Sequence, residues 1–349
     1  MSRLFEPLAI GALTLPNRIV MAPMTRNRSS GTGRVPNAMM REYYTQRAQA
    51  GLIISEATAV SKAGVGYPRS PGIWSAEQVK GWRSVVEGVH AAAGRMFLQL
   101  WHAGRVSDPV HHDGALPVAP SAIALSGTVS LLHPKRPYPV PRALPLSELP
   151  LVIEEFRVGA ENAKRAGFDG VELHAANGYL LDQFLEDGSN RRTDEYGGSV
   201  ENRARLLLEV TDAVISVWGR GRVGVHLSPR GDAQIEGDSN PAATFGYVAR
   251  ELGRREIAFL CVREALSGER FTPSLKAAFG GVLIANEGFD RASAEAVIAA
   301  GEADAVAFGK PFISNPNLPA RFKEGSDLAP WREDTFYEDG PEGYVDYLA

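Results

Sequence analysis

Short apolar runs rich in β-branched residues recur along the chain with helical stretches between them. This pattern is typical of repeated βα units and a parallel sheet. Eight such runs are present, at residues 19–24, 52–57, 96–102, 170–176, 223–229, 259–264, 281–287 and 305–312. Eight strands close a (β/α)8 barrel, so the pattern predicts this α/β fold, the TIM barrel. Residues 200–218, with Ser199 as a plausible N-cap, exemplify the predicted helices.

Two further segments add to this plan. Residues 4–10 and 12–17 flank Gly11 and predict a β-hairpin that closes the amino-terminal end of the barrel. Residues 106–145 are rich in Pro, His, Ser and Gly and are far longer than an ordinary βα connection. They predict a lid loop after the third strand. Because barrels of this size form one unit, we expect a single domain over residues 1–349.

Composition excludes several classes of protein. With 44% hydrophobic and 22% charged residues, the chain has the composition of a soluble globule. The net charge of -4 disfavours a nucleic-acid partner, and neither a signal peptide nor a membrane-spanning run is evident. Its single cysteine, Cys261, excludes an internal disulfide framework. We expect a cytoplasmic protein, a monomer or a homodimer, that acts on small molecules and holds no metal.

Candidate chemistry concentrates in residues 170–184, where His174, Asn177 and Tyr179 lie within six positions. Side chains alternate along a strand, so Val171 and Leu173 face the helices while His174 faces the barrel interior. Barrel enzymes place catalysis at the carboxyl ends of their strands. His174 and Asn177 can donate hydrogen bonds and Tyr179 carries a phenolic proton. This cluster predicts two donors that grip a substrate oxygen beside one general acid.

Other strand ends offer ligand-binding groups. Gln99 should point inward, where a flat heteroaromatic ring with alternating carbonyl and N–H groups would satisfy its amide; a core glutamine bonded to backbone is the equal alternative. Asn286, Gly288, Gly309 and Lys310 follow the seventh and eighth strands, where barrels commonly bind phosphate. The alternative there is a glycine turn beside a surface lysine.

Two apparent motifs carry no such prediction. Gly219, Gly221 and Gly224 spell G-x-G-x-x-G, but they follow a predicted helix and precede a strand, the reverse of a Rossmann fingerprint. His111, His112 and Asp113 are adjacent in a loop, and neighbouring residues seldom reach tetrahedral metal geometry alone.

Several longer motifs point to one family. The sequence HAANGY at 174–179, followed by RTDEYGGSVENR at 192–203, strongly resembles the Old Yellow Enzyme family of FMN-dependent ene-reductases. The similarity extends to APMTR around Met24, ISEAT around Glu56, FLQLWHAGR around Gln99, DAVAFGKPF around Gly309 and the FYEDGPEGY segment near the carboxyl end. These motifs resemble most the bacterial branch with N-ethylmaleimide reductases and xenobiotic or nitrate-ester reductases.

The resemblance implies non-covalent FMN across the carboxyl face of the barrel, reduced by NADPH or NADH. It implies reduction of electron-poor alkenes (enones, maleimides), and of nitrate esters or nitroaromatics, by hydride from flavin N5 with protonation by Tyr179. The cofactor-binding residues it implies are Pro23, Met24, Thr25, Ala57, Gln99, His226, Asn286, Gly288, Gly309 and Lys310. The implied substrate pocket is shaped by Tyr67, Trp101, Gln234 and Tyr337.

The sequence departs from the family at two positions. His226 and Lys310 stand where the family often has arginine. His226 replaces a permanent cation by a titratable group beside the expected flavin. Lys310 replaces a bidentate phosphate fork by a point charge.

Two other functions fit parts of the sequence. A barrel glycosidase needs two carboxylates, which Glu172 on the fourth strand and Glu287 after the seventh could supply. A flavin-binding barrel without enzymatic activity is a further alternative, which the His174, Asn177 and Tyr179 trio disfavours.

Overall fold

Eight parallel strands close into one barrel in the computed structural model, which describes residues 2–230 and 237–347. Each strand pairs with its neighbours in chain order, and the first pairs with the last, which closes the sheet. The strands are β3 (Ile19–Met21), β4 (Leu52–Ile54), β6 (Met96–Trp101), β9 (Gly170–Ala175), β10 (Val223–Leu227), β11 (Phe259–Arg263), β12 (Leu283–Asn286) and β13 (Ala305–Phe308). The predicted (β/α)8 barrel is confirmed, and each predicted run contains its strand.

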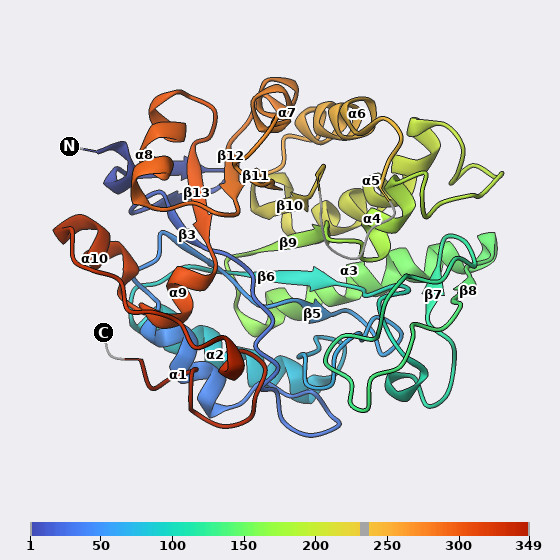
Figure 1. The fold of residues 1–349 in the computed structure, drawn as a ribbon, viewed down its shortest axis with the longest axis horizontal. Helices are drawn as coiled ribbons and strands as arrows, with labels where there is room; N and C mark the ends of the chain where they lie inside the picture. Colours follow the sequence, from blue (N-terminus) through green and yellow to red (C-terminus); the bar gives the residue numbers. More distant parts are fainter. Residues whose placement is uncertain (1, 231–236, 348–349) are drawn as a thin grey trace.

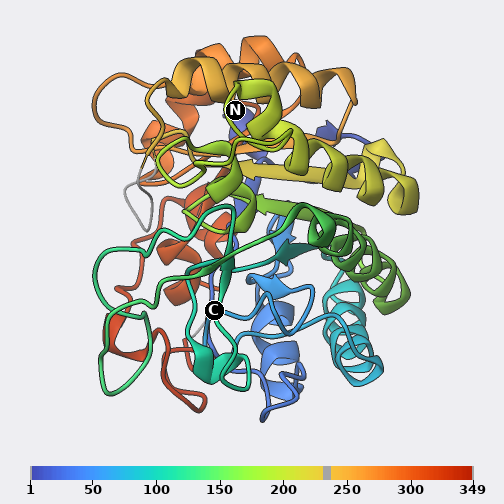
Figure 2. The ribbon, with the colours of Figure 1, turned by 90° about the vertical axis from the view of Figure 1, so that its right-hand side faces the viewer.

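Helices surround the strands, as Figures 1 and 2 show. They are α1 (Ala38–Gln46), α2 (Ala76–Ala91), α3 (Leu149–Ala166), α4 (Leu180–Leu185), α5 (Val200–Trp218), α6 (Pro241–Arg254), α7 (Thr272–Phe279), α8 (Arg291–Ala299), α9 (Lys310–Ser314) and α10 (Leu318–Glu324). The Ser199 side chain accepts a hydrogen bond from the Asn202 backbone and caps α5, as predicted. None of the helices in the described part of the chain has the length and hydrophobicity to cross a bilayer.

The barrel interior is filled by alternate side chains of the strands and closed by the predicted hairpin. Strands β1 (Leu8–Ile10) and β2 (Leu13–Leu15) pair antiparallel. Their Ile10 and Leu15 side chains belong to the same buried cluster as Phe97 and Phe259 of the barrel strands. The hairpin turns at Gly11, whose φ of +51° favours glycine. A Cβ atom there would lie 2.2 Å from the Gly221 carbonyl oxygen, so the turn sits tightly against the chain that leads into β10.

The predicted lid loop, residues 106–145, is largely irregular. It contains the short strand β7 (Val118–Ala119), which pairs with β8 (Arg142–Ala143). Its Leu125, Val129 and Tyr138 side chains are buried in one cluster with Tyr67 and Tyr179. The loop therefore covers the face of the barrel that carries the candidate site, as predicted.

Candidate active site

A cavity of about 750 Å³ opens at the carboxyl ends of the barrel strands. The three predicted catalytic residues, His174, Asn177 and Tyr179, line it. So do the ten residues predicted to bind a cofactor: Pro23, Met24, Thr25, Ala57, Gln99, His226, Asn286, Gly288, Gly309 and Lys310. Its volume lies within the range of small-molecule and cofactor sites. Side chains far apart in the sequence thus converge on one site.

His174 and Asn177 stand where β9 ends. Burial, followed by the nearby His226 and Arg263, holds the pKa of His174 well below its usual range, so the ring is a neutral imidazole. Asn177 has a left-handed backbone, with φ at +60°, and its backbone N–H donates to Ser228 Oγ at 2.7 Å. Strand β9 directs the His174 side chain into the cavity and the turn after it directs Asn177 there, so each offers a neutral hydrogen-bond donor.

Tyr179 follows in the same turn. Its hydroxyl lies 2.6 Å from the Tyr67 hydroxyl, and either oxygen can be the donor. Its ring packs edge-on against both Trp101 and His174, at centroid distances of 5.2 and 4.8 Å. Burial and the neighbouring Tyr67 raise the pKa of Tyr179 well above its usual range. The residue is therefore a protonated phenol, held in place by aromatic contacts.

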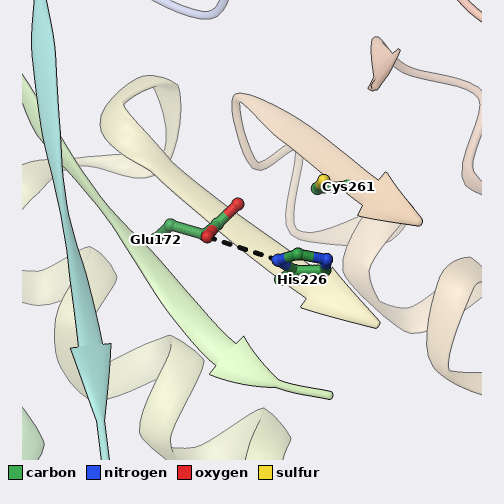
Figure 3. Close-up of side chains that lie close together, drawn as sticks. All are labelled: Glu172, His226 and Cys261. Carbon is green, nitrogen blue, oxygen red and sulfur yellow. Dashed lines mark ion pairs between the residues drawn. The ribbon is translucent and has the colours of Figure 1, made fainter. Parts of the chain in front are cut away.

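Beneath these residues lie Glu172 of β9, His226 of β10 and Cys261 of β11, which Figure 3 shows, and beside them lies Gln99 of β6. Glu172 is fully buried, and its Oε2 accepts a hydrogen bond from Gln99 Nε2 at 2.7 Å. The same oxygen lies 3.6 Å from His226 Nδ1. Neither ring nitrogen of His226 has a hydrogen-bond partner among the described residues. The inward direction predicted for Gln99 is observed, and its partner is a side chain and not the backbone.

Glu172, His226 and Cys261 are also the described residues closest to a metal-ligand set, since their donor atoms lie within 4.8 Å of one another. A closed zinc site takes four ligands, and these three supply fewer. The Glu172 Oε2 atom is, in addition, engaged by Gln99. We therefore interpret the trio as support for the cavity floor.

The lid loop and the carboxyl-terminal part of the chain form the rim of the cavity. Ser130, Leu131 and Lys135 of the lid loop line it, as does the exposed Tyr337. Lys310 Nζ lies at the rim, 2.7 Å from Glu333 Oε1, and both side chains are exposed. An anion bound by Lys310 would therefore compete with Glu333.

The comparisons with known proteins agree with this geometry. A family model described as the NADH:flavin oxidoreductase / NADH oxidase family matches residues 3–329. The chain belongs to this family. It is also similar to the old yellow enzyme homologue from Zymomonas mobilis, with 45% identity, 99% of each chain covered and a TM-score of 0.97.

Two further relatives of this flavin oxidoreductase are informative. Morphinone reductase, in a structure with tetrahydroNAD, is 48% identical over 99% of this chain and 97% of its own, with a TM-score of 0.95. The probable flavin mononucleotide-dependent alkene reductase of Leishmania infantum is 42% identical over 356 residues, which are 99% of this chain and 96% of that protein. The predicted Old Yellow Enzyme family and the predicted class of enzyme are thereby confirmed.

The alternative functions lose their support. Family membership does not favour a glycosidase, and the two carboxylates are committed elsewhere in this flavin oxidoreductase. Glu172 is fully buried and bonds Gln99, while Glu287 forms an ion pair with Arg263. The family description also names an enzymatic activity, which disfavours a barrel that only binds flavin.

Three features of the site differ from the predictions or add to them. Trp101 does not line the cavity but stacks behind Tyr67 at a centroid distance of 5.5 Å. Gln234 lies outside the described residues. Arg263, which was not among the predicted site residues, lines the cavity. Strand alternation from Cys261 would have indicated its inward direction.

Proposed function

We propose that this flavin oxidoreductase binds FMN non-covalently in the cavity and uses NADPH or NADH to reduce electron-poor alkenes such as enones and maleimides. Nitrate esters or nitroaromatics are further acceptors in this proposal. The observation that carries it is the convergence of His174, Asn177 and Tyr179 on one cavity as neutral hydrogen-bond donors. The names of the similar proteins support it, since one is a flavin mononucleotide-dependent alkene reductase and another was captured with a nicotinamide analogue.

The cavity residues suit FMN. Ala57 and Gly309 are small, so a planar ring can approach their backbone, and a Cβ atom at Gly309 would meet only the Met24 side chain, at 3.5 Å. The Gln99 amide donates a hydrogen bond to Glu172, which leaves its carbonyl oxygen to accept one from a ring N–H. His226 adds two buried ring nitrogens that lack hydrogen-bond partners in the described chain. Buried polar groups normally have partners, so this floor suits a heteroaromatic ligand.

The bound FMN would supply the hydride chemistry between nicotinamide and alkene. His174 and Asn177 would donate to the substrate's carbonyl or nitro oxygen and so draw electron density from the conjugated double bond. Tyr179 would give its proton to the α-carbon while the hydride reaches the β-carbon. A donor aimed at developing negative charge is worth about 2.7 to 4 kcal/mol, and a positioned acid about 10² to 10⁴ in rate.

The finer assignments belong to the same proposal. We assign the whole chain to one FMN-binding domain in the cytoplasm, as a monomer or homodimer. Phosphate would bind at Gly309 and Lys310, which lie together at the rim of the cavity. Thr25 and Met24 would contact the ring from the end of the first barrel strand.

A spectrum and a substrate panel test this function. The purified protein should be yellow, lose its visible absorbance when NADPH or NADH is added without oxygen, and regain it with 2-cyclohexenone. The variant with Ala at both His174 and Asn177 is the control: it should still be reduced but turn over the enone poorly. A colourless protein, or a flavoprotein that no electron-poor alkene or nitro compound reoxidises, would contradict the proposal.

A further inference from the structure

Arg263, the last residue of β11, connects two turns of the cavity wall. Its guanidinium Nη1 donates to Asn177 Oδ1 at 2.7 Å. Its Nε and Nη2 atoms contact the two carboxylate oxygens of Glu287 at 2.6 and 3.0 Å, a bidentate ion pair. Asn177 follows β9 and Glu287 follows β12, so the Arg263 side chain connects two turns that lie on either side of β10 and β11 in the wall of the cavity.

The contact determines the orientation of the Asn177 amide. An arginine only donates hydrogen bonds, so the Asn177 atom that faces it must be the carbonyl oxygen. The amide nitrogen is then left for the cavity, and no described residue accepts a hydrogen bond from it. Without Arg263 the amide could rotate and present its oxygen, which would repel the oxygen of a carbonyl or nitro group.

The backbone conformations of the two partners of Arg263 support a positioning role for this side chain. Asn177 has φ at +60° and Glu287 has φ at +95°, both in the region that favours glycine. Residues held in such conformations persist only when their surroundings fix them, and they cluster at functional sites. The Arg263 side chain makes a direct polar contact with each of these two strained residues.

We propose that Arg263 is a positioning residue that fixes Asn177 as a hydrogen-bond donor toward the substrate. The site thereby selects alkenes activated by an oxygen acceptor, such as a carbonyl or a nitro group. This inference rests on the proposed function. Glu287 orients the guanidinium, and its charge offsets that of Arg263 beside the cavity.

A double-mutant cycle tests the inference, with 4-chlorophenol as the probe, because its phenolate resembles the oxyanion that the donors would stabilise. Calorimetry would measure its affinity for the FMN-loaded wild type, Arg263→Met, Asn177→Ala and the double variant. We expect Arg263→Met to weaken binding about tenfold, the effect of one hydrogen bond. In the Asn177→Ala background the same exchange should have no further effect. The KM for 2-cyclohexenone should rise.

A matched control comes from another ion pair. Arg270 pairs with Glu302, and their side chains are 23% and 30% exposed, against 22% and 30% for Arg263 and Glu287. Arg270→Met should leave 4-chlorophenol affinity unchanged. Arg263→Lys keeps the charge but cannot bond Asn177 and both Glu287 oxygens at the same time. It should therefore lose less affinity for 4-chlorophenol than Arg263→Met. It decides the question if the Met variant fails to fold.

Three outcomes overturn the inference. The first is an unchanged affinity for 4-chlorophenol in Arg263→Met or, if that variant does not fold, in Arg263→Lys. The second is an equal loss of affinity on Arg263→Met with and without Asn177. The third is an equal loss of affinity in Arg270→Met. Each leaves the proposed function intact as long as the wild type reduces 2-cyclohexenone. If the wild type fails to reduce any electron-poor acceptor, the proposed function itself fails.

Discussion

The Tyr179 hydroxyl lies 2.6 Å from the Tyr67 hydroxyl, and both residues are buried in one cluster with side chains of the lid loop. Tyr179→Phe keeps the ring contacts and removes the proton. We expect reduction by nicotinamide to stay nearly intact, because that step needs no acid, while alkene turnover slows by about 10² to 10⁴. Stopped-flow measurement of the two half-reactions checks this. Nitro acceptors, which need no proton at carbon, are the internal control, and equal damage to both half-reactions would refute the role of Tyr179.

Glu56, next to the cavity residue Ala57, is a second residue with a measurable consequence. Burial raises its pKa from 4.5 to about 7, against the effect of hydrogen bonds such as that from the Arg26 backbone. Since the folded-state pKa lies above that of the unfolded chain, protonated Glu56 stabilises the fold fully below pH 4.5, and this contribution is lost as the pH rises through 7.

Glu56→Gln should remove this dependence. Urea unfolding of wild type and variant at constant ionic strength should show their stability difference shifting toward the variant between pH 4.5 and 8, by up to about 3 kcal/mol. A difference that is the same at every pH would contradict the raised pKa. The comparison cancels the contributions of other titrating groups, because both proteins share them.

Among the elements, the carboxyl-terminal segment, residues 331–347, is held by arginines from the amino-terminal part of the chain. Arg28 is buried and donates to four of its carbonyl oxygens, those of Thr335, Phe336, Gly340 and Glu342. Its guanidinium also lies 4.6 Å from the centre of the Tyr344 ring. This segment carries Phe336 and Tyr337 to the cavity rim.

Arg28→Ala should release that segment. Removal of the guanidinium leaves buried carbonyls without donors, so we expect a loss of about 2 to 4 kcal/mol in the free energy of unfolding. Early proteolytic cleavage within residues 331–347 and weaker FMN binding should accompany it. Arg254→Ala, at a side chain that is 74% exposed, serves as the control and should change none of these three properties. Wild-type protease resistance in Arg28→Ala would show that other contacts hold the segment.

For the molecule as a whole, the hairpin that closes the barrel makes a clear prediction. Gly11 and Gly31 have nearly the same φ, +51° and +56°, but a Cβ atom would collide with the Gly221 carbonyl only at Gly11 and would meet nothing within 4 Å at Gly31. Gly31→Ala should therefore lower the free energy of unfolding only by the cost of a left-handed backbone at alanine, about 1 to 2 kcal/mol. Gly11→Ala should cost about 1 to 3 kcal/mol more. Equal melting temperatures for the two variants would show that the hairpin turn does not pack closely against Gly221.

How much of this molecule the sequence predicts depends on the kind of signal. Strand alternation correctly placed Gln99 and His174 inside the barrel, because period-two patterns survive in buried parallel strands. Alternation also applied to Arg263, but its partners Asn177 and Glu287 adopt left-handed backbones that their residue types do not signal. Trp101 shows a further limit of the prediction. Strand alternation predicts which way its side chain points, but it does not predict that Tyr67, from a loop distant in the sequence, stacks on its ring.

The site is assembled from the two ends of the chain. In the barrel seam Val306 is the register partner of Ile19, and Phe336 and Tyr337 reach the cavity later still in the sequence. On the ribosome, where the chain emerges from its amino terminus, the barrel cannot close until β13 has left the exit tunnel. A polypeptide that stops before residue 331 therefore lacks Phe336 and Tyr337, two residues that line the cavity, even though every strand of its barrel is present.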